Sequence, residues 1–148
     1  MRRMLAATVL LSLASGCAEK SPEAPSAAPT LTGTWAGDIV VDGVSARMTW
    51  TLTQNGTAIA GPVLVALPTG TVLLNGFLTG ILQDTTTLPY VIAVGPGGIP
   101  TRPTCTGQLS GTMTAKFAVA STLSGPMAIT SSTCTPPLAG SSLSLTRQ

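Results

Sequence analysis

A strictly alternating stretch around the dipeptide Asp42-Gly43 constrains the fold more than any other feature of the chain. After the dipeptide, apolar and polar residues take turns; the apolar set is Val44, Ala46, Met48, Trp50 and Leu52. A period of two predicts a strand with one buried and one exposed face. The residues before the dipeptide alternate in the same way, so the sequence predicts two antiparallel strands joined by a tight turn.

The same dipeptide predicts the register of the two strands. A two-residue Asp-Gly loop favours a type I′ turn, which places Val41 opposite Val44. The pairs expected from this register are Trp35 with Trp50, Ile39 with Ala46, and Asp38 with Arg47. The last pair is an exposed cross-strand ion pair, worth at most about 1 kcal/mol.

A second dipeptide, Asn55-Gly56, is expected to form another turn of this kind, with Leu52 opposite Ile59. Pro62 lacks an N–H group, so it is expected to bulge the following strand or to confine it to a sheet edge.

The middle of the chain is less regular. The runs 71–83 and 86–94 are apolar at consecutive positions, and Asn75-Gly76 fits either a turn or a bulge inside one long strand. The segment 95–103 is the longest irregular stretch of the folded part. It is the loop with the most scope for a binding role, although a plain crossover explains it more simply.

The C-terminal third again reads as strands. The expected segments are one starting at Cys105, then 117–123, 127–133 and 138–146, with turns at 124–126 and 135–137. No segment shows a sustained helical period. The sequence therefore predicts an all-β domain over residues 31–148, an antiparallel barrel of about eight strands, with a β-sandwich as the alternative.

The N-terminus carries a secretion signal. Arg2 and Arg3 precede an apolar run from Met4 to Leu13, and small residues follow. This is the three-part pattern of a cleavable signal peptide, here residues 1–16. The run is shorter than the about 20 apolar residues that a spanning helix needs.

The stretch Leu13-Ala14-Ser15-Gly16-Cys17 resembles the lipobox of bacterial lipoproteins. The resemblance implies that Cys17 becomes the first mature residue and carries acyl chains that hold the protein at a membrane. It implies a cell-envelope location, at an outer membrane and facing the periplasm or the cell surface. Residues 17–30 then comprise the lipidated cysteine and a Pro/Ala-rich linker with a reach of up to roughly 40 Å.

The two remaining cysteines, Cys105 and Cys134, are expected to form a disulfide, because an exported chain meets oxidising conditions. Closing this loop would stabilise the fold by about 3 to 4 kcal/mol on the chain-entropy model.

The charged residues argue against several functions. They make up 8% of the chain, and without Arg2 and Arg3 the five basic residues balance five acidic ones, so nucleic acid is not an expected partner. The chain has no histidine, which removes histidine-based triads and metal sites. The carboxylates of the folded part are Asp38, Asp42 and Asp84, expected in an ion pair and in turns. We therefore predict no enzyme activity, metal or cofactor.

The segment Thr32-Gly33-Thr34-Trp35 resembles the Gly-x-Trp opening of the calycin barrels, the superfamily of lipocalins and avidins. The resemblance implies that a basic residue from the last strand lies over the early tryptophan, and Arg147 is in position to do so. Such cation–π packing contributes about 0.5 to 2 kcal/mol.

Two functions follow as hypotheses. The first is a tethered interaction domain that contacts another envelope protein through its Thr/Ser surface or its loops. The second is a binding module that holds a small apolar ligand inside the barrel. The residues expected to line that interior, or to fill it as a packed core, are Trp35, Met48, Trp50, Leu52, Met113, Leu143 and Leu145.

Overall fold

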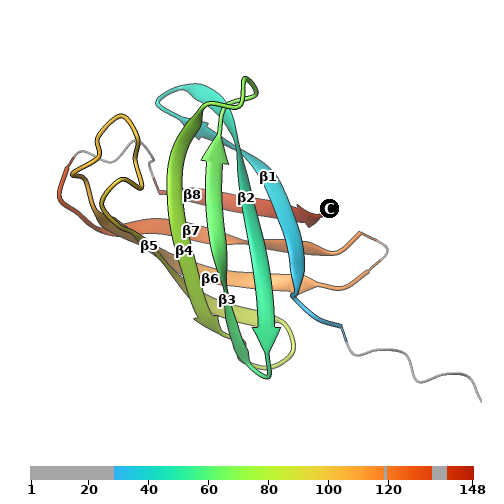
Figure 1. Ribbon diagram of the computed structural model, residues 1–148. Coiled ribbons are helices and arrows are strands. Elements are labelled where there is room, and N and C mark those ends of the chain that lie inside the picture. Colours follow the sequence, from blue (N-terminus) through green and yellow to red (C-terminus); the bar gives the residue numbers. More distant parts are fainter. Residues whose placement is uncertain (1–28, 119, 135–139) are drawn as a thin grey trace, which may run out of the picture.

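The computed structural model describes residues 29–118, 120–134 and 140–148, and they form one closed barrel (Figure 1). Each strand pairs antiparallel with the next, and β8 pairs with β1. The strands are β1 Gly33–Val41, β2 Val44–Asn55, β3 Ala58–Ala66, β4 Val72–Ile81, β5 Thr87–Val94, β6 Gly107–Lys116, β7 Thr122–Ser132 and β8 Ser141–Arg147. The all-β antiparallel barrel is confirmed, and the β-sandwich is wrong because the β1–β8 pairing closes the sheet.

Up-and-down connections give the barrel two distinct ends. The linker end carries residues 29–32, the turns that follow β2, β4 and β6, and Gln148. The loop end carries the Asp42-Gly43 turn, the β3–β4 turn, the segment 95–106 and residues 133–134. In Figure 1 the linker end lies at the lower right and the loop end at the upper left.

The first hairpin has the predicted register throughout. Trp35 pairs with Trp50, Ile39 with Ala46, and Asp38 with Arg47. Asp42 and Gly43 have φ values of 49° and 80°, as a type I′ turn requires. The Arg47 guanidinium lies 3.8 Å from the Asp38 carboxylate, and both side chains are well exposed.

The predicted register of the second hairpin is wrong by two residues. Asn55 pairs with Ala58, and Ile59 lies opposite Gln54 instead of Leu52. Gly56 takes the first central position of the turn with φ of 60°, which suits a type II′ turn, and Asn55 therefore stays in the strand. Because the shift is even, the same side chains still face the interior.

Pro62 interrupts one ladder without making its strand an edge. The β2–β3 pairs pass from Trp50 with Val63 directly to Thr53 with Ala60, so pairing lapses beside the proline. A closed barrel has no edge strand, so the edge expectation is wrong. The register shift of the β3–β4 ladder lies between Val65 and Ala66.

The remaining differences concern expected turns that lie inside strands and the bounds of one strand. Asn75-Gly76 lies inside β4, and 124–126 lies inside β7, so neither is a turn. A Cβ on Gly125 would sit 2.1 Å from the Thr112 carbonyl oxygen, so this glycine permits a close approach of two strands. The expected bounds of the strand 117–123 are wrong, because β6 ends at Lys116 and β7 begins at Thr122. The expected turn at 135–137 lies outside the described residues.

Candidate functional site

The seven residues predicted to line the interior all lie in the core, with 0 to 1% of their surface exposed. They belong to one continuous apolar cluster that runs from end to end of the barrel. Within the described residues, no buried side chain is charged or classed as polar. Packing of this kind resembles a protein core more than a polar ligand site.

Tyr90, the one tyrosine of the chain, lies in this interior. Its hydroxyl donates to the Pro126 carbonyl oxygen at 3.2 Å, and burial raises the pKa of Tyr90 to about 12. Its ring lies 5.0 Å from that of Trp50, centroid to centroid. Trp50 Nε1 is buried without a hydrogen-bond partner among the described atoms.

The linker end is closed by Trp35 and Arg147. Trp35 Nε1 donates to the Leu31 carbonyl oxygen at 2.8 Å, and Leu31 itself is fully buried. Arg147 Cζ lies 5.6 Å from the centroid of the Trp35 ring, and its guanidinium donates to the carbonyl oxygens of Thr30 and Thr32. The last strand thus holds the entering chain over the early tryptophan.

Gly33 makes room for this arrangement. Its φ of 138° disfavours L side chains, and a Cβ there would come within 3.2 Å of the Arg147 guanidinium. The Gly-x-Trp spacing therefore has a local physical reason in this barrel. Gly33 leaves room for the Arg147 guanidinium, and the Trp35 ring lies under that guanidinium.

The loop end is closed by the segment 95–106. Asn75 N donates to the Gly98 carbonyl oxygen at 2.6 Å, and Ile99 is 7% exposed. This segment is therefore packed against the mouth of the barrel rather than held out as a free loop.

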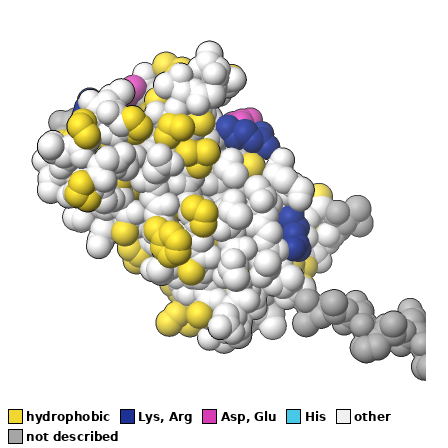
Figure 2. Space-filling view, in the orientation of Figure 1, with side chains coloured by type: hydrophobic (Ala, Val, Ile, Leu, Met, Phe, Trp, Pro, Cys, Tyr) yellow, Lys and Arg dark blue, Asp and Glu magenta, His cyan; other side chains and the backbone are white. Residues whose placement is uncertain are grey.

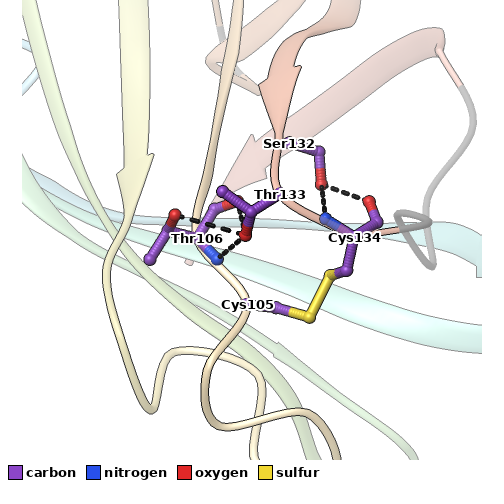
Figure 3. Close-up of a disulfide and its surroundings, with 5 residues drawn as sticks. All are labelled: Cys105, Thr106, Ser132, Thr133 and Cys134. Atoms are coloured by element: carbon purple, nitrogen blue, oxygen red, sulfur yellow. Dashed lines mark hydrogen bonds between the residues drawn. A yellow bond between two sulfur atoms is a disulfide. The ribbon is translucent and has the colours of Figure 1, made fainter.

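A disulfide fastens this closure (Figure 3). Cys105 and Cys134 are joined, with their Cα atoms 5.7 Å apart. Beside them, Thr106 N donates to Thr133 Oγ1 and Thr133 N donates to the Thr106 carbonyl oxygen, each at 3.0 Å. The covalent link and the two hydrogen bonds hold the segment 95–106 to the end of β7.

A small cavity remains beneath this closure. It has a volume of about 30 Å³ and is lined in part by Leu74, Val94, Ile99 and Leu109. That volume suits about one water molecule, whereas ligand pockets usually occupy about 300 to 1,000 Å³. The described interior therefore gives the ligand hypothesis no support.

The outer wall has an apolar face formed by β3, β4 and β5. Its most exposed large side chains are Leu64 at 37%, Phe77 at 51%, Ile81 at 64% and Val91 at 38%. Phe77 lies at the centre, with Pro62 opposite on β3 and Ala93 opposite on β5. Figure 2 shows several hydrophobic side chains spread over this side among white surface, with the larger Lys and Arg groups toward its right.

Charge is absent from the same three strands. No residue of β3, β4 or β5 is Asp, Glu, Lys or Arg. The strands β8, β1 and β2 differ, since their outward positions carry mainly Ser and Thr together with the Asp38–Arg47 ion pair, with Val40 as an exposed apolar residue. The wall therefore has an apolar face and a hydroxyl-rich face.

A shallow, open groove lies over β4, β5 and β6, near the linker end. Its volume is about 640 Å³. The outward residues that line it are Thr79, Ile81, Pro89, Val91, Ser110 and Thr112. On β4 the groove begins at Thr79, two residues after the exposed Phe77.

Sequence reasoning missed this face, although a signal was present. The runs 71–83 and 86–94 are apolar at consecutive positions. In a single-layered barrel one of every two strand residues faces outward, so such runs must expose apolar side chains. Phe77, Ile81 and Val91 are the result.

Several other predictions concern sites that the structure does not place. Cys17, the signal peptide and most of the linker lie outside the described residues. Within the described residues, no group of three or more His, Cys, Asp or Glu side chains could hold a metal ion. The described part also contains no helix with the length and hydropathy of a membrane span.

Comparisons of the chain with family models, curated proteins and solved structures give no match.

Proposed function

We propose that the chain is a bacterial envelope lipoprotein, anchored through Cys17, whose barrel acts as a non-enzymatic contact domain. The observation that carries this proposal is the contrast between a filled interior and an exposed, uncharged apolar face. Exposed apolar patches of this kind mark interaction surfaces on proteins. The anchor would present the face at an outer membrane, toward the periplasm or the cell surface.

We further propose that the barrel is of the calycin type. Its support is the packing of Arg147 over Trp35, together with an up-and-down order of eight strands. The absence of histidine from the chain supports the non-enzymatic part of the proposal.

The anchor is tested by labelling the full chain in cells with an alkyne analogue of palmitate. We expect wild type and the linker control Ser21→Ala to be labelled and to start at Cys17 with an added acyl mass. Cys17→Ala should carry no label. A mature wild-type chain with a free, unlabelled Cys17 would contradict the proposal.

A further inference from the structure

We propose that the partner of the apolar face is a second copy of this chain. Two barrels would pack face to face through β3, β4 and β5, about a twofold axis near Phe77. This inference rests on the proposed function, because it names the partner of the same contact domain.

Charge is the first argument for self-association. Around a twofold axis a residue approaches its own equivalent, so a charged group near the axis meets a like charge. The strands of the apolar face carry no charged residue, and this repulsion therefore does not arise. The β1–β2 hairpin, in contrast, carries Asp38 and Arg47 on its outer side.

Shape is the second argument. The wall of a barrel is convex, and two convex surfaces touch over little area unless one offers a depression. Phe77 is 51% exposed. The groove that begins beside it is lined by Thr79, Ile81 and Val91 on one side and by residues of β6 on the other. A twofold axis beside Phe77 would place the two Phe77 side chains next to each other, each lying over the start of the other copy's groove.

Size is the third argument. Strands lie about 4.8 Å apart and rise about 3.3 Å per residue, so three strands of this length present roughly 15 by 30 Å. This flat value of about 450 Å² per partner, about 900 Å² for the pair, falls in the range of weak or transient interfaces, below the about 1,600 Å² of a standard one. Two copies tethered in one membrane would also meet at raised effective concentration.

A bilayer fits the face less well than a second copy. Interfacial membrane surfaces use Trp or Tyr at the headgroups, with Lys or Arg to attract anionic lipid. The exposed aromatic of this face is Phe77, and β3, β4 and β5 contain no Lys or Arg. The face also offers no free edge to an extended peptide, because β3, β4 and β5 are each paired with a strand on both sides.

The test uses charge pairs at Phe77. Full-length chains with two different affinity tags are co-expressed, solubilised in a mild detergent, and captured through one tag. We expect wild type to carry its differently tagged copy. Phe77→Asp with itself, and Phe77→Lys with itself, should lose at least ten-fold in capture, whereas Phe77→Asp with Phe77→Lys should restore it.

Val40 supplies the matched control, since it is 66% exposed on β1, outside the apolar face. Val40→Asp with itself should be captured as efficiently as wild type. Circular dichroism melting of every variant checks that the barrel folds, which is expected because both positions are exposed.

Two results would overturn the proposal. One is wild-type capture that is absent or unaffected by Phe77→Asp. The other is loss of capture in both variants with no recovery in the mixed pair, which is expected if the face meets lipid or a different protein. Palmitate labelling of Cys17 in the same samples reports separately on the proposed anchor.

Discussion

The two ends of the barrel are closed in different ways. At the linker end, Trp35 of β1 and Arg147 of β8 cover the mouth together with the buried Leu31, and non-covalent packing alone holds them there. At the loop end, the segment 95–106 packs inward through Ile99 and is held by the Cys105–Cys134 disulfide.

The difference shows that an apolar barrel interior can be sealed by packing or by covalent attachment. The packed closure could be predicted from two short features of the sequence, the Gly-x-Trp segment 33–35 and Arg147 in the last strand. The attached closure depends on a loop whose own sequence predicts no structure. Four changes test this contrast, from the largest expected effect to the smallest.

Trp35→Ala should have the largest effect and should act through the linker end. Removing a fully buried indole and its hydrogen bond to Leu31 should lower the free energy of unfolding by about 3 to 5 kcal/mol. Urea unfolding of the mature chain carrying Cys17→Ala measures it. The control Val40→Ala, exposed on the same strand, should stay within about 0.5 kcal/mol. A loss below 1 kcal/mol for Trp35→Ala would show that packing does not close this end.

Replacing both Cys105 and Cys134 by Ala should lower the free energy of unfolding by about 3 to 4 kcal/mol, because the unfolded chain gains freedom. Hydrogen exchange should rise mainly in the segment 95–106 and much less at the linker end. Equal increases at both ends would contradict the idea that each end is closed independently.

Tyr90 provides a probe midway between the ends. Its pKa of about 12 in the folded state exceeds the ordinary value of 10.0, so folding favours the neutral phenol. The stability that the raised pKa of Tyr90 contributes is fully present below pH 10. About 1 to 2 kcal/mol of it is lost as the pH rises toward 12. The protein should therefore lose stability over this range, and Tyr90→Phe should remove the dependence.

Absorbance at the tyrosinate band reads this group alone, since the chain has one tyrosine. A titration midpoint near pH 10 in the folded protein would show that the interior admits water.

Arg147→Gln should have the smallest effect, a loss of about 1 kcal/mol, because its guanidinium is exposed although it lies over Trp35. The indole N–H resonance of Trp35 should shift in its NMR spectrum, while that of Trp50 should not. Arg147→Lys should recover part of the stability. A loss as large as that of Trp35→Ala would mean that the arginine, not the indole, closes the linker end.

Much of the fold could be predicted from local patterns, but only where one local rule decided the geometry. Asp42-Gly43 fixed a register because both residues accept positive φ. At Asn55-Gly56 two turn types compete, and the placement of Gly56 was decided by the strands it joins.

Other features depend on neighbours that are distant in sequence. The local sequence around Gly125 predicts a turn. The residue is a glycine instead because the carbonyl oxygen of Thr112, on the neighbouring strand, leaves no room for a Cβ. The apolar face was not predicted either, because Phe77, Ile81 and Val91 could be assigned to the outside only after the inward set was known.

The central claim is that the barrel is filled and that it acts through its outer wall. Native mass spectrometry of residues 18–148, purified without detergent, tests it most directly. We predict the bare polypeptide mass or its double. A stoichiometric adduct of lipid size that persists in Phe77→Asp would place a ligand inside the barrel and contradict the claim.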